Sequence, residues 1–381
     1  MNFSPLQIGH ITNNIKPVSV DSYSKTAIDL FEQQPELEAI PIEENGEPLG
    51  VISRKITENF AISAVYRGYQ KDLKNFLIPF RGVLESSAFI SRVVDENIKI
   101  DQGKFPAWFM IRHNQQYFGI ASFQHMLEYI NTLRSQDMKV AGEIQKKMLG
   151  KPIVNMDKRF QLLFYNQMAH EIGGDYYRVF KCGDNRYLAA CFDVSGKNIA
   201  GSMATMTLGA CFSTLELFKY QESIETLTAL INSLIKNVSP LGHFVTAVLV
   251  HIDFSSGNLV IHNCGFSPVS IFKSREDRKA VYTVLEPTLP PLGIEDSLNL
   301  KESQTLSISS GLRICTYSDG LTDMSNPLGE RFGEQRTDEF LKTMHTHSHA
   351  EMKQRLDQEI RQWVADASLA DDLTLMDLRF T

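Results

Sequence analysis

The pattern of apolar and polar residues changes near the middle of the chain. Beyond residue 153, short apolar runs are bounded by polar or glycine-containing segments, which predicts strands. Two helical stretches interrupt them. Ala200–Phe218 is apolar nearly all round and is expected to be buried, whereas Met352–Trp363 carries one apolar stripe and is expected on a surface. Strands grouped separately from helices predict an α+β fold. The predicted strands are Leu162–Tyr165, Tyr187–Val194, Phe244–Ile252, Leu259–Cys264, Leu312–Tyr317 and Leu373–Phe380.

The first part of the chain, residues 1–131, contains two passages of similar layout. Ala39–Phe60 and Ala107–Ile130 each read as a strand, a polar turn, a second strand through a glycine, a serine and then a helix. The first turn contains Asn45-Gly46, the pair typical of a tight hairpin. A repeat of roughly 70 residues is the simplest account of this similarity.

A predicted helix over residues 132–150 separates this part from the strand-rich part, residues 151–381. One apolar stripe at helical spacing follows it, and Gly150 and Pro152 end it. Two interpretations stay open: the helix is a linker that pairs with its copy in a homodimer, or it packs on its own domain. The stripe consists of Leu133, Val140, Ile144 and Met148.

Composition narrows the classes of partner. Of 381 residues, 43% are hydrophobic and 22% are charged, which is the balance of a globular protein with a real core. The net charge of −7 argues against nucleic acid or an anionic membrane as the main partner. No signal peptide is visible and no apolar stretch is long enough to span a bilayer, so a cytoplasmic protein is expected. The five cysteines form no CxxC pair and are interpreted as free thiols.

Acidic motifs in the strand-rich part carry the candidate chemistry. Asp193 and Asp319 each follow a predicted strand, and Asp371-Asp372 precede one, so their carboxylates can converge on one rim. Carboxylates gathered in this way repel one another, and cations offset the repulsion. Mg²⁺ and Mn²⁺ prefer such oxygen ligands, and the adjoining glycines allow close approach of the backbone. The motifs are EIGGDYY around Asp175, FDVSGKN around Asp193, YSDGLTD around Asp319 and LADDLTLM around Asp371 and Asp372.

The order of these motifs resembles the PPM family of metal-dependent protein phosphatases, in its bacterial SpoIIE-type branch. The resemblance covers residues 141–381 and includes AGEIQKKML, NCGFSPVSIF, PPLGI and GERFG beside the acidic motifs. It implies an α-β-β-α domain of two packed antiparallel sheets flanked by helices. It further implies two Mn²⁺ or Mg²⁺ ions bridged by Asp193, with the Val194 carbonyl as a further ligand. Asp319 and Asp371 would hold one ion and Asp175 would bind or orient metal waters.

Several points stay open within this resemblance. Asp371 is preferred to Asp372 as the ligand because it lies three residues before Thr374, and Asp372 remains the alternative. Ser195 stands where some relatives place a histidine as proton donor, so a metal-bound water is expected to protonate the leaving group. The two ions would lower the pKa of a shared water, which then attacks phosphorus without a covalent enzyme intermediate.

The N-terminal repeats resemble a tandem pair of CBS domains, a regulatory module known for binding adenine nucleotides. Ile56 and His125 occupy the positions where nucleotide-binding members carry an aspartate, so a module that relays signals without a ligand is the alternative. The combined prediction is a sensor-regulated serine/threonine phosphoprotein phosphatase. Its expected substrate is a phosphorylated regulatory protein such as an anti-sigma-factor antagonist. The alternatives are a non-catalytic scaffold with this fold and a metallohydrolase of small phosphoesters.

Overall fold

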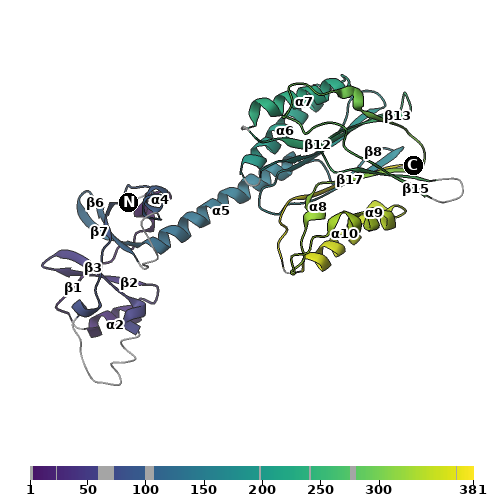
Figure 1. Ribbon diagram of the computed structural model, residues 1–381. Coiled ribbons are helices and arrows are strands. Elements are labelled where there is room, and N and C mark those ends of the chain that lie inside the picture. The colour runs from purple at the N-terminus through teal and green to yellow at the C-terminus, as the bar shows by residue number, and fades with distance from the viewer. Residues whose placement is uncertain are drawn as a thin grey trace. The chain divides into compact units, whose positions relative to one another are not determined.

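The computed structural model contains two compact units, Met1–Asp137 and Met138–Thr381. It describes residues 3–22, 24–58, 73–98, 107–196, 199–239, 242–274, 280–365 and 367–381 (Figure 1). The division falls within helix α5, Phe123–Met148, which contributes its first turns to one unit and its last turns to the other. The helix expected from residue 132 therefore begins earlier, directly after the last strand of the first unit.

The first unit is built from two copies of one layout. In each copy a short strand runs parallel to the first strand of an antiparallel hairpin, with a helix between them. Both hairpins carry an irregularity at the equivalent place, between Ile42 and Glu43 and between Ile111 and Arg112. The structure therefore contains the internal repeat that the sequence predicts. The first copy comprises β1 (Val18–Ser19), α2 (Ser24–Gln33), β2 (Ala39–Glu44) and β3 (Glu47–Ser53), and the second comprises β5 (Gly82–Glu85), α4 (Ile90–Ile98), β6 (Trp108–His113) and β7 (Gln116–Ser122).

Each copy has a core of its own, and a third cluster joins the two copies. This joining cluster is formed by Ala39 and Val51 from the first hairpin and by Trp108 and Ile120 from the second. All four side chains are buried, so the two hairpins stabilise one another in a single unit. Further short elements described in this unit are α1 (Ile8–Ile11), η1 (Leu73–Phe76) and β4 (Ile78–Pro79).

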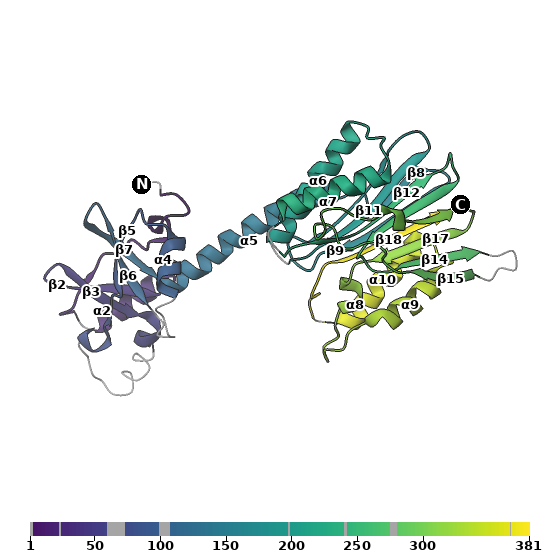
Figure 2. The same cartoon turned by 45° about the horizontal axis from the view of Figure 1, so that its top comes forward.

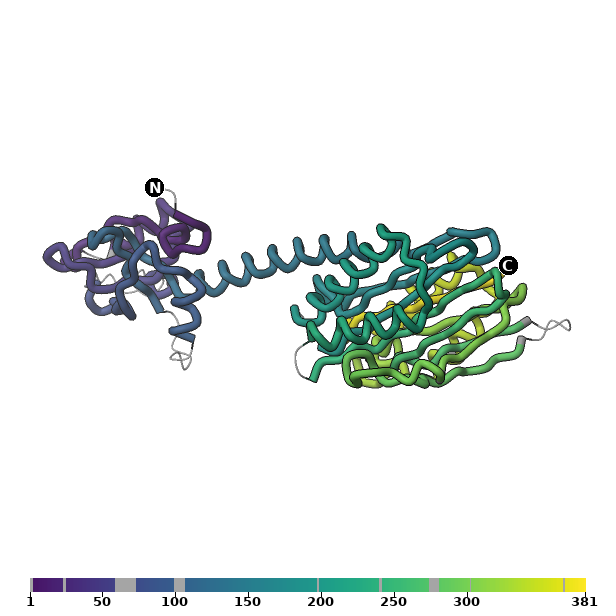
Figure 3. Tube along the Cα trace, turned by 90° about the horizontal axis from the view of Figure 1, so that it is seen from above, coloured from purple at the N-terminus to yellow at the C-terminus, as the bar shows by residue number. Residues whose placement is uncertain are grey.

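Two antiparallel sheets form the centre of the second unit. The five-stranded sheet has the order β10-β11-β12-β13-β16 and the six-stranded sheet has the order β15-β14-β17-β18-β9-β8. Segments far apart in the sequence meet here: β9 and β18 pair over their whole length, as the teal and yellow tubes of Figure 3 show. The strands are β8 (Ile153–Asp157), β9 (Phe160–Gln167), β10 (Asp175–Lys181), β11 (Arg186–Val194), β12 (Val245–Asp253), β13 (Asn258–Cys264), β14 (Val269–Ser274), β15 (Ala280–Leu285), β16 (Gln304–Ser307), β17 (Leu312–Tyr317) and β18 (Leu373–Phe380).

Successive side chains of β11 point to opposite faces of the sheet, and this alternation explains the layers of the unit. Tyr187, Ala189 and Cys191 enter the core between the two sheets, whereas Leu188 and Phe192 face helices α6 and α7. A third core lies under α8, α9 and α10 on the outer face of the other sheet (Figures 1 and 2). The unit is thus an α-β-β-α sandwich, as expected. The helices are α6 (Ile199–Leu217), α7 (Ile224–Val238), α8 (Gly320–Asp323), α9 (Gly333–Met344) and α10 (His349–Val364), with a short turn η2 (Leu300–Glu302).

One expectation about the helices is wrong. Helix α6 is buried along one face only, and Met203 and Leu217 are 64% and 77% exposed. Many of its residues are Ala, Thr and Met. These side chains make every face of the helix weakly polar, but they can also lie at the surface, so the composition does not require burial on all sides. Helix α10 does carry the predicted single stripe, buried at Met352, Leu356 and Ile360. Among the residues described, no helix is long and apolar enough to cross a membrane, and all five cysteines are free.

Candidate active site

A cavity of about 170 Å³ lies at one end of the sandwich, where strand ends from both sheets meet. Asp193, at the end of β11, comes from the five-stranded sheet. Asp319 follows β17, and Asp371 precedes β18, so both come from the six-stranded sheet. With Asp372, four of the predicted carboxylates therefore line one cavity. Its lining is completed by Ala169, His170, Ile172, Gly174, Val194, Ser195, Gly196, Phe244, Thr246, Ala370 and Asp372.

Asp175 is buried beside this cavity and does not line it. It is the first residue of β10 and pairs directly with Asp193 of β11. Ser318, the residue before Asp319, donates its hydroxyl hydrogen to the Asp175 carboxylate at 2.9 Å. Burial raises the pKa of Asp175 well above its usual value, and the charges of Asp193 and Asp372 raise it further, while hydrogen bonds from Thr374 and Ser318 oppose them. The site is thus a concentration of negative charge with one member held away from water.

The two adjacent aspartates 371 and 372 have different surroundings. The Asp372 carboxylate accepts backbone N–H groups from Ala169 at 2.7 Å and from Gly174 at 2.5 Å, and the residue is 8% exposed. A Cβ on Gly173 would lie 2.5 Å from an Asp372 oxygen, so only glycine allows this loop to wrap the carboxylate. Asp371 is half-buried and accepts the N–H of Asp372 at 2.9 Å. Asp372 therefore shapes the loop before β10, while Asp371 is the more accessible carboxylate.

Backbone and side-chain bonds fix the segment that follows Asp193. The Val194 N–H donates to the Gly174 carbonyl at 3.3 Å, and the Ser195 N–H donates to the Phe244 carbonyl at 2.9 Å. The Ser195 hydroxyl accepts the Phe244 N–H at 2.7 Å, and His243 Nδ1 lies 3.0 Å from the Ser195 carbonyl oxygen. Ser195 is therefore a positioning residue of this loop. Lys197 and Asn198, which follow it in the predicted motif, lie outside the described residues.

Gln145, in the last turns of α5, is a site residue that sequence reasoning missed. Its amide donates to the Gly173 carbonyl and to Thr205 Oγ1, both at 2.6 Å, and accepts the Gly173 N–H at 2.9 Å. The side chain is 2% exposed, so these bonds are shielded from water. Gly142, one turn earlier, lets the helix approach the loop, because a Cβ there would lie 2.1 Å from the Glu171 carbonyl oxygen. Helix α5 thus holds the loop that leads into Asp175.

The structure brings the predicted residues together in two tiers. Asp193, Val194, Asp319, Asp371 and Asp372 line the cavity, and Asp175 lies behind it. Among the described residues, no three His, Cys, Asp or Glu side chains are close enough together to hold one ion by themselves. The motif AGEIQKKML contains Gln145, but an amide directly before two lysines on a helix resembles a solvated surface residue, and only its buried contacts, such as that with Gly173, distinguish it.

Comparisons with known proteins agree with this architecture. The sequence profile of the Stage II sporulation protein E (SpoIIE) family matches residues 183–381. The chain is 28% identical over 197 residues to the phosphoserine phosphatase RsbP of Bacillus subtilis, covering 51% of this chain and 46% of RsbP. It is 27% identical over 331 residues to the protein IcfG of Synechocystis, covering 76% of this chain and 49% of IcfG. The chain thus spans about half the length of both relatives.

Among solved structures, the SiaA-PP2C domain of Pseudomonas aeruginosa has the same fold. The two superpose with a TM-score of 0.55 at 16% identity, covering 66% of this chain and 99% of that domain. The profile match spans more than half of the chain and includes Asp193, Asp319 and Asp371. The chain therefore belongs to the Stage II sporulation protein E (SpoIIE) family.

Proposed function

We propose that this chain is a Mn²⁺- or Mg²⁺-dependent phosphatase of phosphoserine or phosphothreonine in proteins. The observation that carries the proposal is the convergence of Asp193, Asp319 and Asp371 on one cavity, with Asp175 buried directly behind it. Strand ends and adjoining loops of both sheets supply these carboxylates, so the site exists only when the whole sandwich is folded. A phosphoryl group is negatively charged, so it can approach these carboxylates only when cations lie between them.

The donor set fits two hard cations. Mg²⁺ keeps several waters and is usually bound through one or two carboxylates, so a site need not gather three acidic side chains around one ion. In the proposed site Asp193 and the Val194 carbonyl would serve both ions, and Asp319 and Asp371 would hold one of them. Asp175, behind the cavity, suits contact through water. Asp371 fits better than Asp372, whose oxygens already accept two backbone N–H groups.

The residues around the cavity have distinct roles in the proposed reaction. When bound, divalent ions supply charge neutralisation and an activated water for in-line attack on phosphorus. Asp193 and Asp371 set the positions of the ligand oxygens from the two sheets, and Gln145 fixes the loop that carries Asp175. Ser195 is no nucleophile in this scheme, because its hydroxyl accepts the Phe244 N–H and anchors the loop.

The proposed substrate is a phosphorylated regulatory protein, such as an anti-sigma-factor antagonist. Two features support it: RsbP is a phosphoserine phosphatase, and the motif order resembles the SpoIIE-type branch throughout residues 141–381. A non-catalytic scaffold or a hydrolase of small phosphoesters is the alternative. All of the expected carboxylates are present, which favours catalysis over a scaffold role.

The N-terminal unit is proposed to regulate this site through α5. That helix begins in the first unit and ends beside the loop before Asp175, which Gln145 holds. Val140 and Ile144 are 57% and 45% exposed on α5, which supports pairing of this helix with its copy in a homodimer. A rearranged α5 would then alter the placement of the carboxylates.

A cavity of about 520 Å³ is the proposed sensor site of the first unit. Elements of both repeats line it, including Ser53 and Ile56 from the first and Trp108 and Gln124 from the second. The Trp108 indole N–H is buried without a hydrogen-bond partner in the described structure, as a donor awaiting a ligand would be. Arg54, also in the lining, donates to three backbone carbonyls. An adenine nucleotide would therefore need other contacts for its phosphates.

Metal-dependent turnover tests the proposal. The purified protein should release phosphate from phosphoserine peptides and from para-nitrophenyl phosphate when Mn²⁺ is added, and EDTA should abolish this release. Faster turnover of peptides separates a protein phosphatase from a hydrolase of small esters. If wild-type protein is inactive with every metal and Asp193→Asn leaves Mn²⁺ affinity unchanged, the proposal fails.

A further inference from the structure

We propose that an apolar pocket beside the catalytic cavity is a subsite for an apolar side chain flanking the phosphorylated residue of the substrate protein. The inference rests on the proposed function and specifies its substrate. The pocket has a volume of about 270 Å³ and lies against α6 and the end of α7. Val194, Ala200, Met203, Ala204 and Val238 form most of its apolar lining.

The pocket and the catalytic cavity are neighbours that share a wall. Val194 and Ser195 line both hollows. Hydrogen bonds to Gly174, Phe244 and His243 hold this wall in place. A phosphoserine in a protein is always flanked by other residues, which advance by about 3.3 Å each in an extended chain. When its phosphoryl group occupies the cavity, a neighbouring side chain comes within reach of the pocket.

Size and polarity select the kind of side chain. Small-molecule sites usually measure about 300–1,000 Å³, so a pocket of 270 Å³ suits one side chain better than a whole ligand. Its described lining contains no Asp, Glu, Lys or Arg. A charged side chain would lose its hydration there and find only the hydroxyls of Thr207 and Ser239 and the His243 ring beside the Ser195 wall, whereas Leu, Ile, Val or Met would gain apolar contact.

The mouth of the pocket presents apolar surface that a substrate would cover. Met203 is 64% exposed, and Ile199, one turn earlier on α6, is 56% exposed. Residues four apart lie on the same face of a helix, so the two form one apolar edge. Methionine adapts its shape to different partners, which suits a surface that receives peptide side chains.

A peptide series measures the inferred preference. Phosphoserine peptides carrying leucine at one flanking position are compared with peptides carrying aspartate there, from three residues before to three after the phosphoserine. The inference expects a KM about tenfold lower for leucine at one or two of these positions. Met203→Glu should remove that preference by raising the KM of the leucine peptide, and Met203→Leu should retain it. Phe218→Glu, an equal charge change directly after the far end of α6, is the matched control and should also retain the preference.

Para-nitrophenyl phosphate separates the two levels of the inference, because it has no flanking side chain. If wild-type protein with Mn²⁺ hydrolyses neither this ester nor any peptide, the proposed function fails and the subsite with it. If it hydrolyses both kinds of substrate without preference at any position, only the subsite is wrong. Met203→Glu lowering turnover of ester and peptides equally would likewise overturn the subsite.

Discussion

Two buried aspartates in the second unit, Asp175 and Asp377, lie in opposite surroundings. Asp377 on β18 receives Nε and Nη2 of Arg313 at 2.8 and 2.6 Å, and His349 Nε2 lies 3.0 Å away. Asp175 on β10 pairs with Asp193 across the sheet. Burial acts to raise the pKa of both carboxyls. The close approach of His349 and Arg313 outweighs it and lowers the pKa of Asp377, whereas the charge of Asp193 raises the pKa of Asp175 still further.

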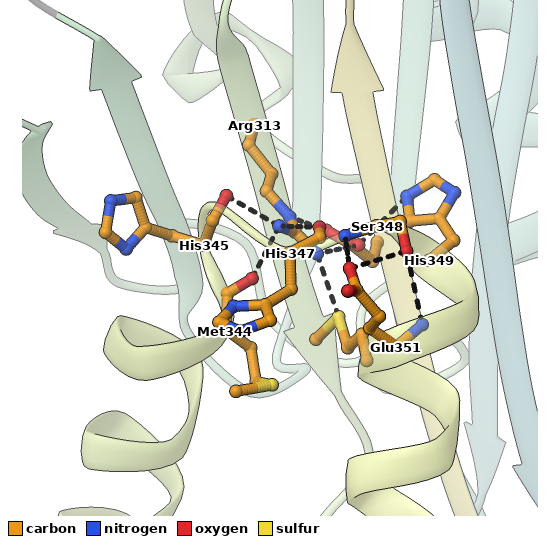
Figure 4. Close-up of polar contacts among 9 residues, drawn as sticks. Arg313, Met344, His345, His347, Ser348, His349 and Glu351 are labelled. Carbon is orange, nitrogen blue, oxygen red and sulfur yellow. Dashed lines mark hydrogen bonds and ion pairs between the residues drawn. The ribbon is translucent and has the colours of Figure 1, made fainter. Parts of the chain in front are cut away.

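The Arg313 cluster has a structural role (Figure 4). Its guanidinium also donates to the carbonyls of Met344, His345 and His347 at 2.7, 2.6 and 3.0 Å, and so fixes the turn between α9 and α10. Ser348 begins α10 directly afterwards with a capping box to Glu351. The buried charges of Arg313 and Asp377 therefore compensate one another within the chain.

The charge of Asp377 serves stability, whereas the charge of Asp175 belongs to a site that is suited to binding. Arg313 compensates Asp377 within the fold, so that cluster needs nothing from solution. The two largest influences on the pKa of Asp175 are its burial and the charge of Asp193, and bound cations would relieve the repulsion between the carboxylates. Such a site lowers the stability of the unliganded protein in return for function.

Removing Asp377 should have the largest effect on stability. Asp377→Asn leaves Arg313 buried without its counter-ion, which costs roughly 3–5 kcal/mol of the free energy of unfolding. Urea denaturation of the second unit measures this loss. Asp184→Asn removes a fully exposed carboxylate and is the matched control. A loss under about 1 kcal/mol would mean that the Arg313 pair contributes no more than a surface ion pair.

Removing Asp193 should have the largest effect on activity while leaving the fold intact. Asp193→Asn keeps the shape of the side chain and removes the expected bridging charge, so Mn²⁺-dependent turnover should fall by about 10²–10³-fold. Steady-state kinetics at saturating Mn²⁺ measures the change, again with Asp184→Asn as control. Nearly full activity of Asp193→Asn would rule out the bridging role.

Loss of the Gln145 amide should weaken the site from a distance. Gln145→Leu leaves the N–H and C=O of Gly173 without their partner, and changes of this kind beside metal ligands typically cost about 10–100-fold in metal affinity or activity. Mn²⁺ titration monitored by calorimetry tests this. Glu143→Ala changes an exposed residue of the same helix and should be neutral. If Gln145→Leu binds Mn²⁺ as tightly as wild type, α5 does not position the loop before Asp175 for metal binding.

Replacing Asp175 should have the smallest effect on stability. This replacement should stabilise the metal-free protein at neutral pH, whereas replacing Asp377 should destabilise it. Because the native pKa of Asp175 is raised, the metal-free folded state binds more protons than the unfolded state between an unfolded pKa of about 3.9 and the native value. Stability should therefore fall as pH rises through this window. In EDTA, Asp175→Asn should flatten the slope and raise Tm at neutral pH by a few °C, about 2–4 °C for each kcal/mol relieved.

Thermal unfolding from pH 4 to 7.5, with and without Mn²⁺, checks the Asp175 prediction. The contribution of Asp377 does not interfere, because a lowered pKa gives stability that is complete above the unfolded pKa and is lost only in stronger acid. Mn²⁺ should stabilise the wild-type protein more than Asp175→Asn. If Asp175→Asn in EDTA has a lower Tm than wild type at pH 7, the buried charge of Asp175 does not destabilise the metal-free protein, and the prediction is wrong.

The central strands of the sandwich could be predicted from local patterns, because they are apolar on both faces, whereas the peripheral strands β8, β14, β15 and β16 are not among the predicted runs. The predicted bounds of β17 and β18 agree with the structure, since polar residues end each run sharply. Strand β10 was not predicted, because Gly173 and Gly174 before it read as a loop. Its pairing with β11, which sets Asp175 against Asp193, is a tertiary property that spacing does not encode.

The carboxylates of the site were predictable from their motifs, whereas their supporting residues were not. Ser318 and Gln145 are ordinary polar residues in the sequence, and their roles depend on contacts with Asp175 and Gly173. Asp371 and Asp372 were indistinguishable by chemistry, and the N–H groups that converge on Asp372 separate them only in the folded chain.

The most direct test of the central claim is an anomalous-diffraction map of crystals grown with Mn²⁺. Two manganese peaks in the cavity are expected, with Asp193 between them, Asp319 and Asp371 on one ion, and Asp175 in contact through water. Ions held elsewhere, or a cavity without manganese at saturating concentration, would contradict the claim that these aspartates form the catalytic metal site.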